Sequence, residues 1–494
     1  MNRSKRVCTL LLAALLTLSL GACGNKREAA ASAVYDQVMA RFTGELERGA
    51  VVKVLDNDTA VELGYVAALI DAFNEAYKDK GVSAERMNTD QYSDLASDGP
   101  YGYGPDVWYQ ANDIIMKYAD KQHILPLPVK DMEGMDQIPQ SAWEAYAINM
   151  SGETFYCGVP VNVQTGMIFY IESMLPDNWK TEWDINGNGK PDFFETYTAL
   201  YALSKDIQEN GGKTEYGYLD DLVDVYFMTG YLFTFGAYVF GDNDTNPEDI
   251  GFDKGDAAKG LYMVRQWAKL MDNTEVIDKA FASAAYAYLA KGKMLCTVTT
   301  PDVRAMFLRE MVSNGWTQEE AERDLKMIPV PRLPLSGDLT ADDWRDTITR
   351  KDEITAETKM MGGMNGYGMS AYTKCPNAAL AFIQFAASYE QVLLRNKMLG
   401  ITPARADAAA TVGAADDMVQ IIFANLDAGL IDIMPAINAV GQIWTPAESF
   451  LVEVTTDALN ENRGEPVSYD TLDKLQAGLE RLCQQIHDAI FTLA

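Results

Sequence analysis

The chain has 494 residues, 48% of them hydrophobic and 23% charged, a composition typical of a globular protein long enough for two domains. The formal net charge of −30 argues against nucleic acid or an anionic membrane surface as a partner of the main body. The sequence contains only two histidines, which makes a histidine-based triad or a multi-histidine metal site hard to build.

The N-terminal segment has the pattern of a bacterial lipoprotein signal. Arg3, Lys5 and Arg6 precede an apolar run at 10–20 that is too short to span a bilayer. The sequence Leu-Gly-Ala-Cys that follows resembles the lipobox, so 1–22 is expected to be removed and Cys23 to carry the lipid. Residues 23–35 then form a flexible tether that holds the body at the extracytoplasmic face of the cell membrane.

The body begins with a βα unit. Val51–Leu55 is predicted to be a buried strand, and the polar turn 56–59 follows it. Apolar residues then recur at helical spacing from Val66 to Tyr77. In open α/β sheets, ligands bind at the loops that follow the strands, so this turn is a candidate ligand loop.

Further elements follow the same alternation of strands and helices. Residues 105–113 are predicted to form a strand that ends in polar groups, and Gly158–Tyr170 is an uncharged stretch typical of a buried strand. We interpret Gly158–Tyr170 as the first crossing between two lobes. The remaining predictions are a helix that begins at Asn377 and runs to Met398, a capping box at 317–320, a strand at 294–300, helices at 194–208, 256–271, 281–290, 450–460 and 468–493, and an acidic surface excursion at 337–358.

Several motifs in order along the body resemble those of extracellular solute-binding proteins of the maltose-binding type. They lie at 104–113 with 124–127, 158–176, 280–294, 361–369, 376–382 and 433–444. The resemblance implies an α/β, periplasmic-binding-protein-like type II fold, in which two lobes are joined by a hinge and enclose a ligand cleft. Lobe 1 would comprise 36–163 and 367–404, and lobe 2 would comprise 167–362 and 410–494.

The resemblance also implies the ligand-binding positions. Maltose-binding members have stacking tryptophans where this chain has Gln110 and Asp302, whereas Trp444 matches the last of them, so the ligand is expected to be a sugar other than maltodextrin. Asp224, Tyr226 and Phe227 form the best local match. The full set is Asp58, Thr59, Trp108, Tyr109, Gln110, Asp113, Gln164, Asp224, Tyr226, Phe227, Asp302 and Trp444.

The function that the resemblance implies is that of the substrate-binding lipoprotein of an ABC importer. Its partners would be a carbohydrate and the membrane subunits of a permease; the protein would be a monomer without a catalytic step, and nucleic acid is not an expected partner. Two alternatives remain open at this point. One is a secreted hydrolase that uses paired carboxylates, and the other is a ligand sensor for a membrane kinase.

A second motif carries a different chemistry. Residues 184–195 fit the calcium-loop pattern D-x-[DN]-x-[DN]-G-x5-E without a mismatch. The expected ligands are Asp184, Asn186, Asn188, the carbonyl of Lys190, Asp192 and Glu195. Pro191 departs from paired EF-hands, so we predict a lone calcium loop with a structural Ca²⁺. The alternative is a tight turn without a metal.

Overall fold

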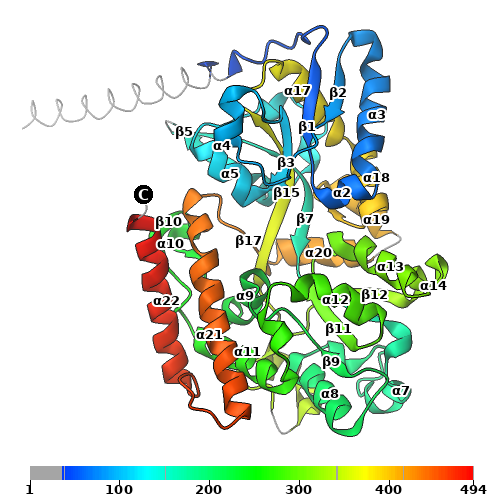
Figure 1. Cartoon of the computed structure of the whole chain (residues 1–494), viewed down its shortest axis with the longest axis vertical. Helices are drawn as coiled ribbons and strands as arrows, with labels where there is room; N and C mark the ends of the chain where they lie inside the picture. Colours follow the sequence, from blue (N-terminus) through cyan, green and yellow to red (C-terminus); the bar gives the residue numbers. More distant parts are fainter. Residues whose placement is uncertain (1–35, 38, 151, 341–342, 415–416, 493–494) are drawn as a thin grey trace, which may run out of the picture.

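The computed structural model describes residues 36–37, 39–150, 152–340, 343–414 and 417–492. Within these ranges the chain forms two α/β lobes, one above the other along the long axis of the molecule (Figure 1). No helix in the described part of the chain combines the length and apolar character needed to cross a membrane. The predicted signal peptide at 1–22, the tether at 23–35 and the lipidation site Cys23 lie outside the described residues.

The upper lobe is built on a sheet with the strand order β16-β7-β15-β3-β1-β2, and β4 and β17 also pair with β15. β1, β2 and β3 run parallel, so the loops that follow them lie at one edge of the sheet. The strands are β1 (Val51–Leu55), β2 (Ser83–Arg86), β3 (Val107–Ala111), β4 (Ile124–Leu125), β7 (Val159–Thr165), β15 (Met360–Ser370), β16 (Thr402–Pro403) and β17 (Ile431–Ile433), with a hairpin of β5 (Ala147–Met150) and β6 (Glu153–Tyr156) beside them. The helices are α2 (Asp58–Glu62), α3 (Tyr65–Tyr77), α4 (Leu95–Asp98), α5 (Asn112–Asp120), α6 (Gln140–Glu144), α17 (Pro376–Ala386), α18 (Tyr389–Leu399) and α19 (Ala406–Gly413).

The lower lobe contains a second sheet with the strand order β12-β8-β11-β9. Its strands are β8 (Met167–Ile171), β9 (Tyr216–Tyr218), β11 (Met294–Thr299) and β12 (Leu325–Pro329), with the short strands β10 (Asn246–Ile250), β13 (Leu333–Pro334) and β14 (Thr355–Ala356) outside this sheet. Its helices are α7 (Trp179–Glu182), α8 (Tyr197–Asn210), α9 (Val225–Phe233), α10 (Gly241–Asp244), α11 (Ala257–Met271), α12 (Phe281–Ala290), α13 (Arg304–Ser313), α14 (Gln318–Asp324), α15 (Trp344–Thr349), α16 (Lys351–Ile354), α21 (Trp444–Asn462) and α22 (Leu472–Thr492). α21 and α22 pack side by side on α11, and α20 (Asp417–Asp427) contacts strands of both sheets.

The chain crosses between the lobes along β7 and β15. β7 belongs to the upper sheet and continues through Gly166 into β8 of the lower sheet, as predicted for Gly158–Tyr170. β15 pairs antiparallel with β7 from Gly362 to Tyr367, with an irregularity in register between Asn365 and Gly366. A Cβ atom added at Gly362 would lie 2.1 Å from Ile431 Cγ2 in β17. Glycine is therefore required where the neighbouring strand approaches the crossing so closely.

The helix predicted from Asn377 to Met398 is wrong in its start and its continuity. Pro376 occupies the first turn, where its fixed φ is favourable, so the N-cap of α17 is Cys375, two residues before Asn377, which was predicted to cap this helix. The side chain of Asn377 does not cap the helix. It donates to Glu47 Oε1 at 2.8 Å and accepts from the Gly44 amide at 3.0 Å, which ties the N-terminal segment to α17. The chain then leaves the helix at Ala387, and α18 starts after Ser388.

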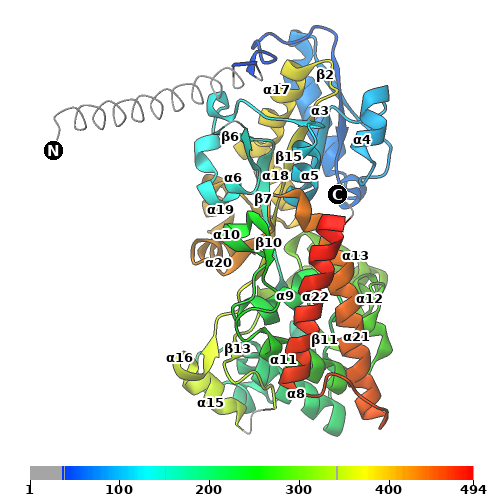
Figure 2. The ribbon, with the colours of Figure 1, turned by 90° about the vertical axis from the view of Figure 1, so that its left-hand side faces the viewer.

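The acidic segment at 337–358 is more ordered than a simple surface excursion. It contains α15 and α16, which lie at the lower end of the molecule, far from the crossing (Figure 2). Trp344 stacks on Trp183 with ring centroids 4.4 Å apart, and Thr347 is buried. The aromatic contact explains why an acidic segment folds back on the lobe.

The predicted capping box at Thr317 and Glu320 is confirmed at the start of α14.

A buried ion pair holds the first βα loop of the upper lobe. Asp56 follows β1 directly, and its carboxylate accepts hydrogen bonds from Arg395 of α18 at 2.9 and 3.1 Å. Tyr367 of β15 donates to the same carboxylate at 2.8 Å. The Arg395 guanidinium lies over the ring of Tyr109, 3.7 Å from its centroid. Because both charges are almost inaccessible to solvent, each depends on the other for compensation.

We expect Arg395→Met to lower the free energy of unfolding by about 3–5 kcal/mol, because the Asp56 charge would stay buried without its partner. Urea denaturation followed by circular dichroism measures this change. Arg350→Met is the matched control, since Arg350 pairs with Asp346 at 3.2 Å with both side chains about half exposed. Exposed pairs contribute roughly 0–1 kcal/mol. Equal losses in the two variants would contradict the role given to the buried pair.

Candidate functional site

A cavity of about 360 Å³ lies in the lower lobe at the N-terminal ends of α9 and α21. Asp224 and Trp444, which the sequence predicts as ligand contacts, both line it. Asp224 is positioned by capping α9, where its Oδ1 accepts from the Tyr226 amide at 2.9 Å. The 3₁₀ helix Asn438–Gln442 lies just before α21 and contacts α5 of the upper lobe. Trp444, the first residue of α21, is therefore close to the junction between the two lobes.

Tyr226 links this cavity to the crossing. Its hydroxyl donates to the Gln164 carbonyl of β7 at 3.1 Å, and its ring meets that of Phe227 edge-on at 5.3 Å. A Cβ atom at Gly363 of β15 would lie 3.9 Å from the Tyr226 hydroxyl and 4.0 Å from Asn112 Oδ1. The lower lobe, through Tyr226, and the upper lobe, through Asn112, therefore meet on β15.

The charges of carboxylates from both lobes act on Tyr226. Burial raises the pKa of its hydroxyl, and the negative charges of Asp302, Asp224 and Asp113 raise the pKa further. Asp113 comes from the first turn of α5 in the upper lobe, whereas Asp224 and Asp302 belong to the lower lobe. Three of the predicted acids are thus close enough to act on one hydroxyl group at the junction.

Acids of both lobes also act on Tyr92, which lies in the upper lobe. Partial burial raises the pKa of the Tyr92 hydroxyl, and the charges of Asp113, Asp58, Asp90 and Asp302 raise it further. Asp58 is exposed in the first turn of α2, and Thr59 beside it is half-buried. Tyr92 itself is 65% exposed, so a large aromatic ring is available to solvent next to these acids.

Asp302 has an unpaired acceptor atom. Its Oδ1 is buried and has no hydrogen-bond partner. Burial raises the pKa of this carboxyl group, while hydrogen bonds with Thr300 and Gln164 and the charge of Arg395 lower the pKa. An unsatisfied buried acceptor is unfavourable, and a ligand hydroxyl could supply the missing donor.

Three predicted contacts lie elsewhere and are corrected here. Trp108 and Tyr109 are 1% and 2% exposed and pack in the core of the upper lobe. Trp108 Nε1 donates to the Gln91 carbonyl at 3.1 Å, and Tyr109 packs on Arg395. The Gln110 side chain is also buried and donates to the same Gln91 carbonyl. Trp108 and Gln110 thus hold the backbone of Gln91, next to Tyr92, from inside the upper lobe.

The structure also reveals site residues that the sequence did not predict. Lys279 and Glu448 line the cavity and form an ion pair across it, although they lie in distant parts of the chain. Asp221 lines the same cavity, and burial raises the pKa of its carboxyl group to about 7. Tyr92 was missed because it lies in an irregular loop after β2 with no periodic pattern. Only the fold brings these residues together.

The predicted calcium loop lies between α7 and α8, and none of its residues lines the cavity. Asp184, Asn186, Asn188 and Lys190 form its turn, and Asp192 and Glu195 lead into α8. In the part of the chain that the structure describes, no three His, Cys, Asp or Glu side chains converge as a metal site. The loop instead closes on its own hydrogen bonds.

The two sheets, the paired crossing strands and the junction site define a type II periplasmic-binding fold. The chain belongs to the bacterial extracellular solute-binding proteins, since the profile of that family matches residues 68–420. It is similar to the maltodextrin-binding protein MdxE of Bacillus subtilis, with 21% identity over 460 residues that cover 92% of this chain and 93% of that protein. A galactooligosaccharide-binding protein of Bacillus subtilis is 22% identical over 463 residues, which cover 92% and 94% of the two chains.

Solved structures show the same fold. MalX from Streptococcus pneumoniae in complex with maltopentaose superposes with a TM-score of 0.65 at 17% identity, and the match covers 89% of this chain and 99% of that chain. The maltose-binding protein MalE from Listeria monocytogenes in complex with maltose gives a TM-score of 0.64 at 20% identity, covering 90% and 99%.

Proposed function

We propose that this protein is the substrate-binding component of an ABC importer and that its ligand is a carbohydrate. The names of its relatives support the ligand class, because they bind maltodextrin, galactooligosaccharide or maltooligosaccharide. The observation that carries the proposal is the position of Trp444 and Asp224 in one cavity, next to the Tyr226–Phe227 pair on which acids of both lobes act. Aromatic faces pack on the C–H surfaces of sugars, and carboxylates accept hydrogen bonds from their hydroxyl groups.

The charge at the junction narrows the ligand class. Negative charges act on both Tyr92 and Tyr226, and they come from Asp58, Asp113, Asp224 and Asp302. Lys279 lines the cavity, but its positive charge is already paired with Glu448. An anionic ligand would be repelled by this field, whereas a neutral oligosaccharide would not. We therefore propose a neutral sugar. Maltose-binding members have stacking tryptophans at two positions where this chain has Gln110, which is buried, and Asp302, which is acidic. We therefore propose that this protein does not hold its sugar by the same stacking contacts as those that hold maltodextrin.

Binding would act through the relative position of the lobes. A ligand that contacts both half-sites favours the arrangement in which they face each other, by an amount equal to its difference in affinity for the two arrangements. Motion about the crossing strands is the usual form of such closure. The permease subunits would recognise the closed form. No catalytic step is part of this proposal, and hydrolysis of an oligosaccharide by the purified protein would contradict it.

The N-terminal segment completes the proposal with a membrane anchor. The relative from Streptococcus pneumoniae is a solute-binding lipoprotein, which supports lipidation of Cys23 at the extracytoplasmic face. Replacement of Cys23 by Ser should move the protein from the membrane fraction to the soluble fraction of the producing cells, because the thiol that accepts the lipid is lost. Immunoblots of the two fractions measure this. Unchanged membrane association of the variant would refute the anchor and leave the binding proposal intact.

The ligand proposal is tested with Trp444→Ala after a thermal-shift screen of neutral oligosaccharides has identified a binder. Loss of the ring should weaken affinity about tenfold or more, since aromatic contacts contribute about 0.5–1.5 kcal/mol beyond the buried area. Isothermal titration calorimetry measures the change. Trp179→Ala is the matched control, because Trp179 is a half-buried ring on α7, which contributes no residue to the cavity. Equal affinities of the two variants would remove Trp444 from the site.

A further inference from the structure

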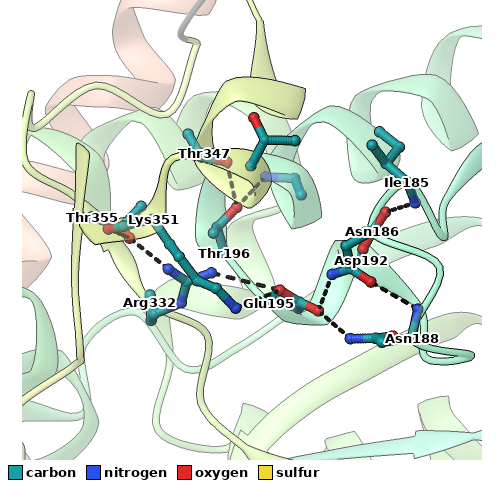
Figure 3. A network of polar contacts seen from close by, with 12 residues as sticks. Ile185, Asn186, Asn188, Asp192, Glu195, Thr196, Arg332, Thr347, Lys351 and Thr355 are labelled. Carbon is teal, nitrogen blue, oxygen red and sulfur yellow. Dashed lines mark hydrogen bonds and ion pairs between the residues drawn. The ribbon is translucent and has the colours of Figure 1, made fainter. Parts of the chain in front are cut away.

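The loop 184–195 brings oxygen-bearing side chains together around Glu195 (Figure 3). The terminal amide nitrogens of Asn186 and Asn188 lie 2.7 and 2.9 Å from Glu195 Oε1. The Gly189 amide donates to Asp184 Oδ2 at 3.1 Å, and Gly189 has a φ of +76°, which favours glycine. All these contacts lie within one turn, and by themselves they would also fit a loop without a metal.

An independent observation is the buried carboxylate of Asp192. This side chain is 0% exposed, and its Oδ1 has no hydrogen-bond partner. Its Oδ2 accepts from the Ile185 amide across the loop, which aims the carboxyl group into the turn. The charges of Glu195 and Asp184 both act on Asp192. The positive charge of Lys351 also acts on Asp192, but the buried Oδ1 atom itself still lacks a hydrogen-bond donor or a bound cation.

We propose that residues 184–195 form a calcium site. The ligands would be the carboxylates of Asp184, Asp192 and Glu195, the side-chain oxygens of Asn186 and Asn188, and the main-chain carbonyl of Lys190. Because the three carboxylates do not converge in the structure described here, the loop would have to tighten around the ion. These are oxygen donors, as Ca²⁺ requires, and their spacing is that of a calcium-loop motif. Each asparagine amide would have to turn its oxygen toward the ion, which breaks the hydrogen bonds that Asn186 Oδ1 and Asn188 Oδ1 accept from the Asn188 and Lys190 amides at 3.0 and 2.8 Å.

The site is coupled to the lower end of the lobe. Glu195 uses Oε1 for the loop, whereas its Oε2 lies 3.6 Å from Arg332 and 3.9 Å from Lys351. Arg332 donates to Thr355 at 2.7 Å, which connects Glu195 to β14. Thr196 caps α8 and lies 2.9 Å from Thr347 of α15. A calcium ion would therefore fasten the loop, α8 and the segment 344–356 to one another.

The site is independent of the carbohydrate cavity. Its residues and those of the cavity do not overlap, and α15 and α16 lie at the end of the molecule far from the crossing (Figure 2). The role we infer is stabilisation of the lower lobe. With only three carboxylates among the ligands, calcium affinity is expected in the range of extracellular modules, roughly 10⁻⁴–10⁻³ M.

The test uses the whole mature protein after treatment with EDTA. Addition of 10 mM CaCl₂ should raise Tm by on the order of 2–5 °C, as expected for an ion well above its Kd. Terbium, a luminescent analogue of calcium, should bind at one site and be excited through Trp183, which directly precedes Asp184. Equal MgCl₂ is the control for general screening of the net charge of −30.

Asp184→Asn and Glu195→Gln should each weaken terbium binding at least tenfold and abolish the rise in Tm with calcium. Glu209→Gln, an exposed acid at the end of α8, is the matched control and should behave as the wild type. Since Glu195 also contacts Arg332, Asp184→Asn decides the outcome if Glu195→Gln does not fold. The proposal is overturned if terbium luminescence is absent, if Asp184→Asn binds as well as the wild type, or if magnesium raises Tm as much as calcium does.

Discussion

The arrangement of both lobes depends on the pairing of β7 with β15. These two strands cross the junction together, and β15 is buried along its whole length. Gly362 and Gly366 occur where the neighbours approach most closely, since a Cβ atom at Gly366 would lie 2.3 Å from the Val159 carbonyl oxygen. Side chains on these residues would push the strands apart. Glycine at these two positions therefore lets the strands pack closely where the chain passes between the lobes.

The crossing also places the polar groups of the site. Tyr226 of the lower lobe donates to the β7 backbone, and Asn112 of the upper lobe accepts from the Met364 amide of β15 at 3.3 Å while donating to the Met434 carbonyl at 2.9 Å. Behind them, the Asp56–Arg395 pair fixes the loop after β1. These contacts position α5 and α9, the elements that carry Asp113 and Asp224, at the junction.

The architecture could be predicted well from the sequence because its signals are local. The uncharged run at 158–170, the βα unit after Val51 and the capping box at Thr317 are patterns that neighbouring residues determine. The site was harder to predict. Asp113, Asp224 and Asp302 were predicted from the family resemblance, and the charges of all three act on Tyr226. Trp108 and Tyr109 were misplaced because both faces of β3 are buried, so successive side chains of this strand enter the core on opposite sides of the sheet. Lys279, Glu448 and Tyr92 have no local signal, since only the folded chain brings them to the junction.

The central claim is that one solute bridges the two lobes about the β7–β15 crossing. Small-angle X-ray scattering of the mature protein, with and without a sugar at a concentration that calorimetry shows to be saturating, tests it most directly. The account predicts a smaller radius of gyration and a smaller maximum dimension in the presence of the sugar. Identical scattering profiles at proven saturation would contradict it, because the ligand would then occupy one lobe without drawing in the other.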